Sequence, residues 1–515
     1  MMKKNLFSEA RWTAWQFGLL FLLLGFSILT FLGFPAFLIY PPDGLHIIRQ
    51  MDSLSFVSHY FHHGMHFFEP GVYNLGQGTT GKAASEFPLF YYITACLYHL
   101  TGEKTWLLRM LHLLTLMTGA YFLARALKNI LQDVFYALCL TFLFLSSSVI
   151  LYYAANYLPD IPALGFSMGG WGLFLDYLNK RSKTKLVSSV FFFTLAALLK
   201  ITTLINPISV ILLVVLAHTR KSLHWSHQHH LDFKFIILLM SILLAVVAAW
   251  TVFVLSYNHL HQTRVFLTAP MPVWNLNTME RATVWDYINR FWYSKYYYET
   301  SLHVFAVIGL TGLILYRKSD RTLWFNALFL LGGGLAYFML FFAQFRDHDY
   351  YFLTLVPVII FIVLNGFVAI KRWKPVLFRH WITKSLLALL TLLSLNYGWL
   401  NLQRRFSHQD RFTETGQVFM GARAYLDQHN VPSDAKMIVI GDPTPHVSLY
   451  LMNRKGWTLE NLERLNKEIL DAMIQKGATH IVLVTADEEA SLRTYNIHYQ
   501  DIGEYNGIKI MEIIR

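Results

Sequence analysis

Long apolar segments recur along the first 400 residues of this chain and constrain its fold more than any other feature. The runs between Trp15 and Leu400 are long enough to cross a hydrocarbon core of about 30 Å, which takes roughly 20 residues of helix. Of the 515 residues, 55% are hydrophobic and 14% are charged, a balance unlike that of soluble domains. The sequence therefore predicts an all-α polytopic bundle in a membrane.

The apolar segments predict about eleven transmembrane helices. The segment 87–101 is also apolar, but at about 15 residues it is too short for a full crossing, and we expect an interfacial or re-entrant helix there. The expected spans lie near residues 13–38, 105–124, 134–153, 161–178, 186–201, 203–217, 235–256, 303–316, 323–343, 352–370 and 384–400.

The basic loops orient this bundle. If 87–101 does not cross, the N-terminus, Arg220 and Lys221 share one side with loops 179–185, 316–321 and 371–379, and the positive-inside rule makes that side cytoplasmic. The C-terminal part then lies outside the cytoplasm. The chain has no Asn-x-Ser/Thr sequon, which favours a bacterial inner membrane protein. The net charge of +12 comes from the membrane part, so we expect no nucleic-acid partner.

The chain divides into a membrane domain at 1–400 and a soluble domain at 401–515. The membrane domain has two long outer loops, 41–104 and 257–302, which we expect to roof a cavity. The C-terminal domain alternates helices near 417–428 and 459–475 with strands near 436–442, 479–484 and 507–513, which predicts a small α/β domain with a partly parallel sheet. Its IGDPTP loop resembles a strand-end binding loop, but no G-x-G-x-x-G or P-loop is present.

Charged residues gather on the predicted outer side in four places. Ionisable groups at a membrane boundary are costly unless they are paired or face a wet cavity, so together they indicate a functional site. Carboxylates can act as a general base or as metal ligands, and Arg, Lys and Tyr can hold an anion. The four elements are Arg49–Asp52, Lys82 with Ser85–Pro88, Asn156–Asp160 and Arg346–Tyr351.

Taken in order, these pieces resemble the GT-C class of membrane glycosyltransferases. The branch includes the dolichyl-phosphate-mannose protein mannosyltransferases and the bacterial aminoarabinose transferases for lipid A. The resemblance covers about residues 12–370. Its motifs are RQMD, SEFPLFYY, Arg109, YLPD, LLKITTLINP with Lys200, and HDYYFLTLVP.

The resemblance implies an inverting transferase that moves a sugar from a polyprenyl-phosphate donor to a lipid, glycan or protein acceptor on the outer face. Asp52 matches the catalytic base, Glu86 and Asp160 match further acids of the site, and Tyr350 matches a contact of the carrier phosphate. Arg264 and Arg346 join them by position only. The full predicted set of donor and substrate contacts is Arg49, Lys82, Lys200, Arg264, Arg346, His348, Asp349 and Tyr350.

Several alternatives stay open at this stage. Asp52 and Asp160 could instead cap helices, for which Asp is well suited. The two could also hold a divalent cation, Mg or Mn, as some GT-C relatives require one. A transporter or flippase of a lipid-linked saccharide would need a similar amphiphile cavity, but it tends to show internal repeats and interrupted spans, and the sequence shows no repeat.

Overall fold

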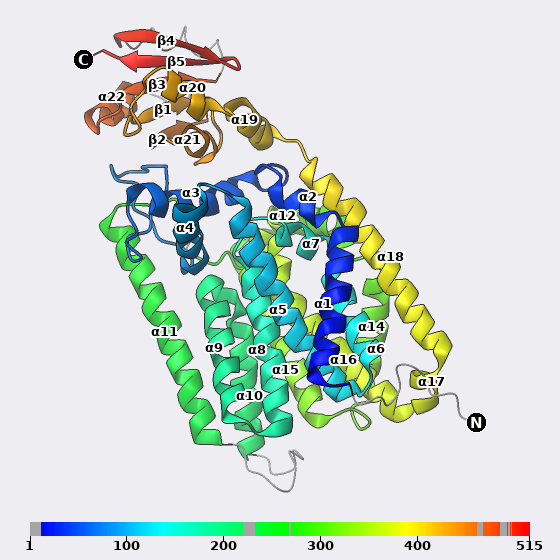
Figure 1. The fold of residues 1–515 in the computed structure, drawn as a ribbon. Coiled ribbons are helices and arrows are strands. Elements are labelled where there is room, and N and C mark those ends of the chain that lie inside the picture. The colour runs from blue at the N-terminus through cyan, green and yellow to red at the C-terminus, as the bar shows by residue number, and fades with distance from the viewer. Residues whose placement is uncertain are drawn as a thin grey trace.

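The computed structural model describes residues 12–219, 232–266, 269–460, 467–484, 492, 495 and 497–514. Residues 1–11 lie outside these ranges, as do Arg220 and Lys221. The charge pattern predicts that all of these residues are cytoplasmic. Most of the described chain is a bundle of long helices, with a small sheet at one end (Figure 1).

The chain is an integral membrane protein. Seven described helices are long and apolar enough to cross a bilayer, with mean hydropathies between 1.3 and 2.7. Some expose long apolar side chains outward, because lipid rather than protein covers that face. The seven are α1 (Ala14–Phe31), α5 (Trp106–Leu131), η1–α10 (Ile201–Thr219), α11 (Phe233–Leu260), α15 (Arg321–Leu340), η5–α16 (Asp349–Trp373) and α18 (Trp381–Phe406).

Four further helical segments fall on the remaining expected spans. The helices α6 (Val134–Leu145) and α7 (Ser148–Ala154) bend by 77° at their junction, which makes one broken span or a re-entrant loop. The others are α8 (Asp160–Lys180), α9 (Lys183–Leu199) and α14 (Glu299–Ile314). All eleven expected segments are therefore helical, and the number that cross the membrane stays a prediction.

Small residues let the central helices approach closely. Gly119 of α5 faces Gly165 of α8, and a Cβ on Gly119 would lie 1.8 Å from the Gly165 carbonyl oxygen. Such contacts are typical of membrane helices, which associate through close packing rather than hydrophobic burial. The contact fixes the outer end of α8, where Asp160 lies.

The outer loops form short helices across one end of the bundle. The helix α2 (Phe34–Ile39) precedes the first loop, which contains α3 (Ile47–His63) and α4 (Leu89–Thr101). Figure 1 shows α3 and α4 between the membrane helices and the sheet. The second contains η2 (Val273–Asn275), α12 (Thr278–Tyr287), η3 (Ile288–Trp292) and α13 (Tyr293–Tyr296), while η4 (Phe342–Phe345) and α17 (Pro375–Arg379) join membrane helices.

The C-terminal segment forms a five-stranded sheet in the order β2-β1-β3-β5-β4. β1 pairs in parallel with β2 and β3, whereas β5 is antiparallel to both β3 and β4. The sheet is therefore mixed, as the sequence predicts. Its strands are β1 (Met437–Ile440), β2 (Gly456–Leu459), β3 (His480–Leu483), β4 (Tyr499–Tyr505) and β5 (Ile508–Ile513); its helices are α19 (Arg411–Phe419), α20 (Ala422–Gln428), α21 (Val447–Met452) and α22 (Lys467–Gln475).

Two helices of this segment differ from expectation. The helix expected at 417–428 is split into α19 and α20, because Gly421 adopts a φ of 84° at the break. Of the range 459–475, expected to be one helix, Leu459 belongs to β2, residues 461–466 lie outside the described residues, and Lys467–Gln475 forms α22.

The sheet docks on the first outer loop through backbone and side-chain contacts. The Gly456 N–H donates to the Tyr73 carbonyl at 3.1 Å, and the Leu75 N–H donates to the Gly456 carbonyl at 2.8 Å. Val447 of α21 is buried in one apolar cluster with Met51 of α3. The C-terminal segment and the first outer loop therefore share a core, which brings the β1–α21 loop above α3.

Candidate functional site

A cavity of about 940 Å³ lies where loops 41–104 and 257–302 meet one end of the helical bundle. Its lining includes apolar side chains of α9 and the loops and, from α11, Val247, Trp250 and Val254. The lining also includes charged and aromatic side chains. These include seven predicted site residues, Arg49, Asp52, Glu86, Lys200, Arg346, His348 and Tyr350.

Arg49 joins the two acids of the first outer loop. Its Nη1 lies 3.0 Å from Asp52 Oδ2 and its Nη2 lies 3.3 Å from Glu86 Oε1. Glu86 also accepts hydrogen bonds from the Ser85 hydroxyl at 2.6 Å and the Tyr91 hydroxyl at 2.5 Å. Arg49 and Asp52 lie one helical turn apart on α3, so this face of the helix presents both charges to the cavity.

The Arg49 guanidinium and the Glu86 carboxylate stay ionised although both are buried. Burial alone would lower the pKa of Arg49, but Glu86 and Asp52 outweigh it and raise that pKa above its ordinary value. Burial would raise the pKa of Glu86, but the Arg49 guanidinium and the hydrogen bonds from Ser85 and Tyr91 lower it. Glu86 is therefore a carboxylate at neutral pH and fixes the far end of Arg49.

A residue of the C-terminal segment reaches the other oxygen of Asp52. His446 is fully buried, and its Nε2 lies 3.2 Å from Asp52 Oδ1. Burial lowers the pKa of His446, while Asp52 opposes that shift. Asp52 thus lies between a guanidinium from its own helix and an imidazole from the β1–α21 loop.

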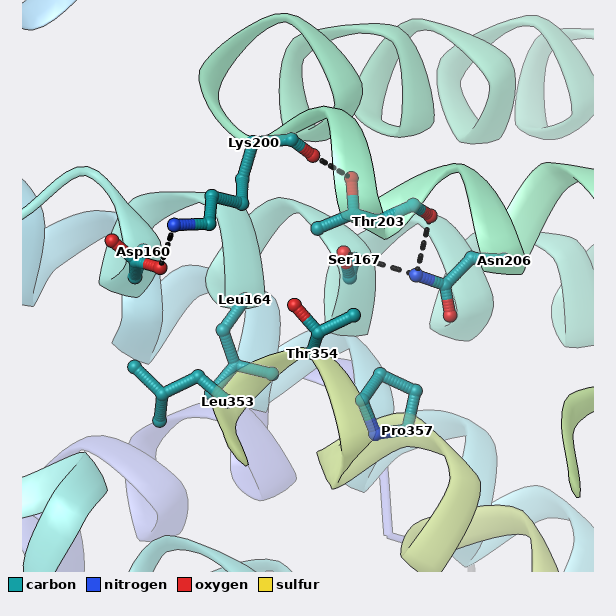
Figure 2. Close-up of a pocket in the computed structure, with 9 residues that line it drawn as sticks. All are labelled: Asp160, Leu164, Ser167, Lys200, Thr203, Asn206, Leu353, Thr354 and Pro357. Atoms are coloured by element: carbon teal, nitrogen blue, oxygen red, sulfur yellow. Dashed lines mark hydrogen bonds and ion pairs between the residues drawn. The ribbon is translucent and has the colours of Figure 1, made fainter. Parts of the chain in front are cut away.

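Asp160 and Lys200 form a second pair on the membrane side of the cavity. Asp160 begins α8, Lys200 ends α9, and Lys200 Nζ lies 2.8 Å from Asp160 Oδ1 (Figure 2). The ammonium also lies 5.2 Å from the Tyr350 ring centroid and 4.8 Å from that of Tyr351, within the range of a cation–π contact. The two rings are neighbours, with centroids 5.4 Å apart, and a buried lysine beside them is well placed to meet an anion in the cavity.

A small polar pocket continues below this pair into the bundle. It has room for about one water molecule, with a volume of about 10 Å³. Figure 2 shows Ser167, Thr203 and Asn206 around it, with the Asn206 amide donating to Ser167 and to the Thr203 carbonyl. These hydrogen bonds hold the junction of α8, η1 and α10 that supports Lys200.

Asp349 is placed differently from its neighbours in HDYY. It is fully buried, 2.5 Å from Arg405 Nη1, and it accepts a hydrogen bond from the Tyr153 hydroxyl at 2.6 Å. His46 Nε2 lies 3.3 Å away. Asp349 does not line the cavity, whereas His348 and Tyr350 do.

Three predicted cations have little or no contact with the central cluster. Lys82 lies 2.7 Å from Glu69 on an exposed part of the loop, outside the cavity lining. Arg264 is exposed and also lies outside that lining. Arg346 does line the cavity, but its guanidinium is half exposed and donates to the adjacent Asp347.

The donor set for a divalent cation is incomplete. Asp52 is paired with Arg49 and Asp160 with Lys200, and each pair already neutralises its carboxylate. Within the described ranges no three His, Cys, Asp or Glu side chains are placed to share a metal ion. Asp52 and Asp160, as they are paired here, therefore do not form a donor set for a resident divalent cation.

Sequence patterns missed the residues that reach the site from distant segments. His446 follows the IGDPTP loop, and the end of a parallel strand is where such loops bind ligands. The sequence therefore indicates that His446 lies at the end of a strand, but it does not indicate that its partner is Asp52. His46 and Tyr351 also line the cavity. His46 lies at the start of α3 with a φ of 59°, a left-handed backbone conformation that the local sequence does not predict.

Comparison of whole structures finds clear similarity, although no protein-family model and no curated protein sequence match the chain. ArnT from Cupriavidus metallidurans in the apo state aligns with a TM-score of 0.60 at 13% identity, over 97% of this chain and 98% of ArnT. The same protein bound to undecaprenyl phosphate gives a TM-score of 0.59 at 13% identity over the same shares. The chain has the fold of the GT-C membrane glycosyltransferases.

A second GT-C structure agrees with this result. The Archaeoglobus fulgidus oligosaccharyltransferase, in complex with Zn and sulfate, aligns with a TM-score of 0.51 at 11% identity, over 88% of this chain and 65% of its own length. The similarity to ArnT extends over nearly all of both chains, so it includes the C-terminal segment as well as the bundle. The GT-C resemblance that the ordered motifs predict is thus confirmed for the fold.

Proposed function

We propose that the protein is an inverting glycosyltransferase, which moves a sugar from a polyprenyl-phosphate carrier to an acceptor on the outer face of the membrane. The observation that carries the proposal is the mixed lining of the cavity. Apolar side chains from α9, α11 and the loops suit a polyprenyl chain, and Asp52, Lys200 and Tyr350 line the same cavity. The ArnT structure with undecaprenyl phosphate, which has the same fold, supports a lipid phosphate as the donor.

Asp52 is the proposed general base. It takes the proton of the acceptor hydroxyl, whose oxygen attacks the anomeric carbon from the face opposite the phosphate. The bond between that carbon and the phosphate oxygen breaks, and the electron pair leaves with the polyprenyl phosphate. A positioned base of this kind contributes about 10² to 10⁴ in rate.

The cations of the cavity act on the leaving group. Lys200, held by Asp160 and flanked by Tyr350, faces the charge that develops on the departing phosphate. Preorganised charges in a site shielded from water stabilise such a transition state most effectively. Arg346 lines the same cavity and, being half exposed, is free to adjust to the donor. Glu86 acts through Arg49 and keeps that guanidinium beside Asp52.

We infer the compartment from the charge pattern of the sequence. In the proposed topology the N-terminus is cytoplasmic, the cavity and the C-terminal segment lie outside the cytoplasm, and the bundle lies in a bacterial inner membrane. Membrane lipids surround the bundle, and the acceptor is a lipid, glycan or protein with a free hydroxyl or amine. A lipid-linked donor suits this face because the sugar must arrive there already activated.

A proteoliposome assay separates transfer from transport. The purified protein is reconstituted with a polyprenyl-phosphate donor whose sugar is labelled, together with candidate acceptors, and both labelled product and movement of the donor between leaflets are measured. We expect labelled product. Movement of the donor between leaflets without transfer to any acceptor would instead establish the flippase alternative.

A further inference from the structure

The loop between β1 and α21, residues 441–446, carries a histidine from the C-terminal sheet to Asp52. Its N-terminal part is held by Asp442, whose carboxylate accepts hydrogen bonds from the Thr444 N–H at 2.7 Å and from the Ser448 N–H at 3.3 Å. Asn74 of the first outer loop donates to the Pro445 carbonyl at 2.7 Å. The loop is therefore fixed both to its own sheet and to the first outer loop.

We propose that His446 is a positioning residue that orients the Asp52 carboxylate, so that the C-terminal segment completes the catalytic site. This inference rests on the proposed role of Asp52 as general base. His446 itself does not line the cavity, whereas Asp52 does. The imidazole therefore acts through Asp52 rather than on the substrate.

The surroundings of His446 point to a single partner. Its ring is fully buried, and among the described residues neither ring nitrogen has a hydrogen bond of good geometry. Nε2 lies 3.2 Å from Asp52 Oδ1. The ring stacks at 6.4 Å on Phe266, a residue of the cavity wall. A buried imidazole without a hydrogen-bond partner destabilises the folded protein, so the ring is expected to engage the carboxylate that faces it.

The arrangement restrains both oxygens of Asp52. Arg49 lies at Oδ2 and His446 at Oδ1, so the plane of the carboxylate is set by two elements from distant parts of the chain. A neutral imidazole with its proton on Nε2 can donate to Oδ1. Without it the carboxylate can rotate about its side chain, and misplacement of a reacting group by about 1 Å can cost about 10²-fold in rate.

The test replaces His446 with residues that separate shape from hydrogen bonding. His446→Phe keeps an aromatic ring against Phe266 but has no nitrogen, and we expect kcat to fall about 10- to 100-fold with the donor KM within about twofold of wild type. His446→Gln restores an N–H donor and should recover part of kcat. His480→Phe is the matched control, because His480 is also buried in the sheet and lies outside the cavity lining.

A double-mutant cycle with Asp52→Asn identifies the partner. If His446 acts through Asp52, adding His446→Phe to Asp52→Asn lowers kcat no further. Multiplied losses would overturn the inference, as would a wild-type kcat in His446→Phe. Equal losses of kcat in His446→Phe and His480→Phe would show a general effect on the sheet and would also overturn it.

Thermal unfolding of the same four proteins tests the contact without turnover. We expect the changes in Tm for Asp52→Asn and His446→Phe to be non-additive, as for groups in contact. If the wild type transfers no sugar from the polyprenyl-phosphate donor, the proposed function fails, and this cycle still decides the contact. Additive changes in Tm would refute the contact itself, whatever the activity.

Discussion

The helix α3 and the turn η5 each bury an aspartate beside an arginine, and the two pairs differ in how completely the aspartate is engaged. Asp349 is fully buried and is held by Arg405, Tyr153 and His46. Asp52 opens onto the cavity, and its Oδ1 has no hydrogen bond of good geometry although His446 lies 3.2 Å away. The Asp349 carboxylate is thus fully engaged by protein groups, whereas the Asp52 carboxylate is accessible from the cavity.

The comparison shows how the same charge pair can serve stability or chemistry. Arg405 lies at the end of α18, which leads into the C-terminal segment, so its contact with Asp349 ties that helix to η5. Removing one partner of a buried pair is costly because it leaves the other charge uncompensated. A base, in contrast, must present a lone pair of its carboxylate to the acceptor hydroxyl, and Asp52 lines the cavity whereas Asp349 does not. We therefore propose a structural role for Asp349 and a catalytic role for Asp52.

The largest effect on stability is expected for Asp349→Asn. It leaves the buried Arg405 without its carboxylate and should lower the free energy of unfolding by about 3 to 5 kcal/mol, as measured by denaturation in detergent. Asp347→Asn is the control, because the Asp347–Arg346 pair is half exposed and such pairs contribute about 0 to 1 kcal/mol. Equal losses in the two variants would remove the distinction between saturated and exposed pairs.

Substitutions of Tyr350 and Tyr153 should have opposite effects on two measurements, the binding of polyprenyl phosphate and Tm. Tyr350→Phe removes a hydroxyl predicted to contact the donor phosphate, and a hydrogen bond to a charged group is worth about 1.5 to 3 kcal/mol. We expect about 10- to 150-fold weaker binding of polyprenyl phosphate with little change in Tm. Tyr153→Phe removes a donor to Asp349 and should lower Tm while leaving that binding unchanged. The reverse pattern would exchange the two assignments.

The smallest effect is expected for Lys82→Gln. Lys82 pairs with Glu69 on an exposed part of the loop, away from the cavity lining, and such a pair contributes about 0 to 1 kcal/mol. Donor KM should stay within about twofold of wild type. A tenfold rise in donor KM would instead place Lys82 at the donor phosphate, as its position in the motif suggests.

The helices of the bundle could be predicted from the sequence because apolar length sets them directly. The short strands β2 and β4 could not. β2, GWTL, is four residues long and begins with glycine. β4, YQDIGEY, is an edge strand with a register shift between Asp501 and Gly503, and its polar residues hide the alternation that marks a strand.

The candidate site was predictable only where its residues lie in local motifs. Arg49 and Asp52 are one turn apart on a single helix, so the sequence places them together. Asp160 and Lys200, although both predicted, meet only because α8 and α9 pack side by side. His446 and Arg405 depend on how the C-terminal segment docks, and no periodicity of the sequence encodes that contact.

Asp52, on the wall of the cavity, is the proposed base for sugar transfer from a lipid phosphate. The most direct measurement is single-turnover transfer of labelled sugar from a polyprenyl-phosphate donor by purified wild type and Asp52→Asn. We predict equal binding of the donor by both proteins, and transfer about 10² to 10⁴ times slower in the variant. Transfer at the wild-type rate by Asp52→Asn, with normal donor binding, would contradict the account.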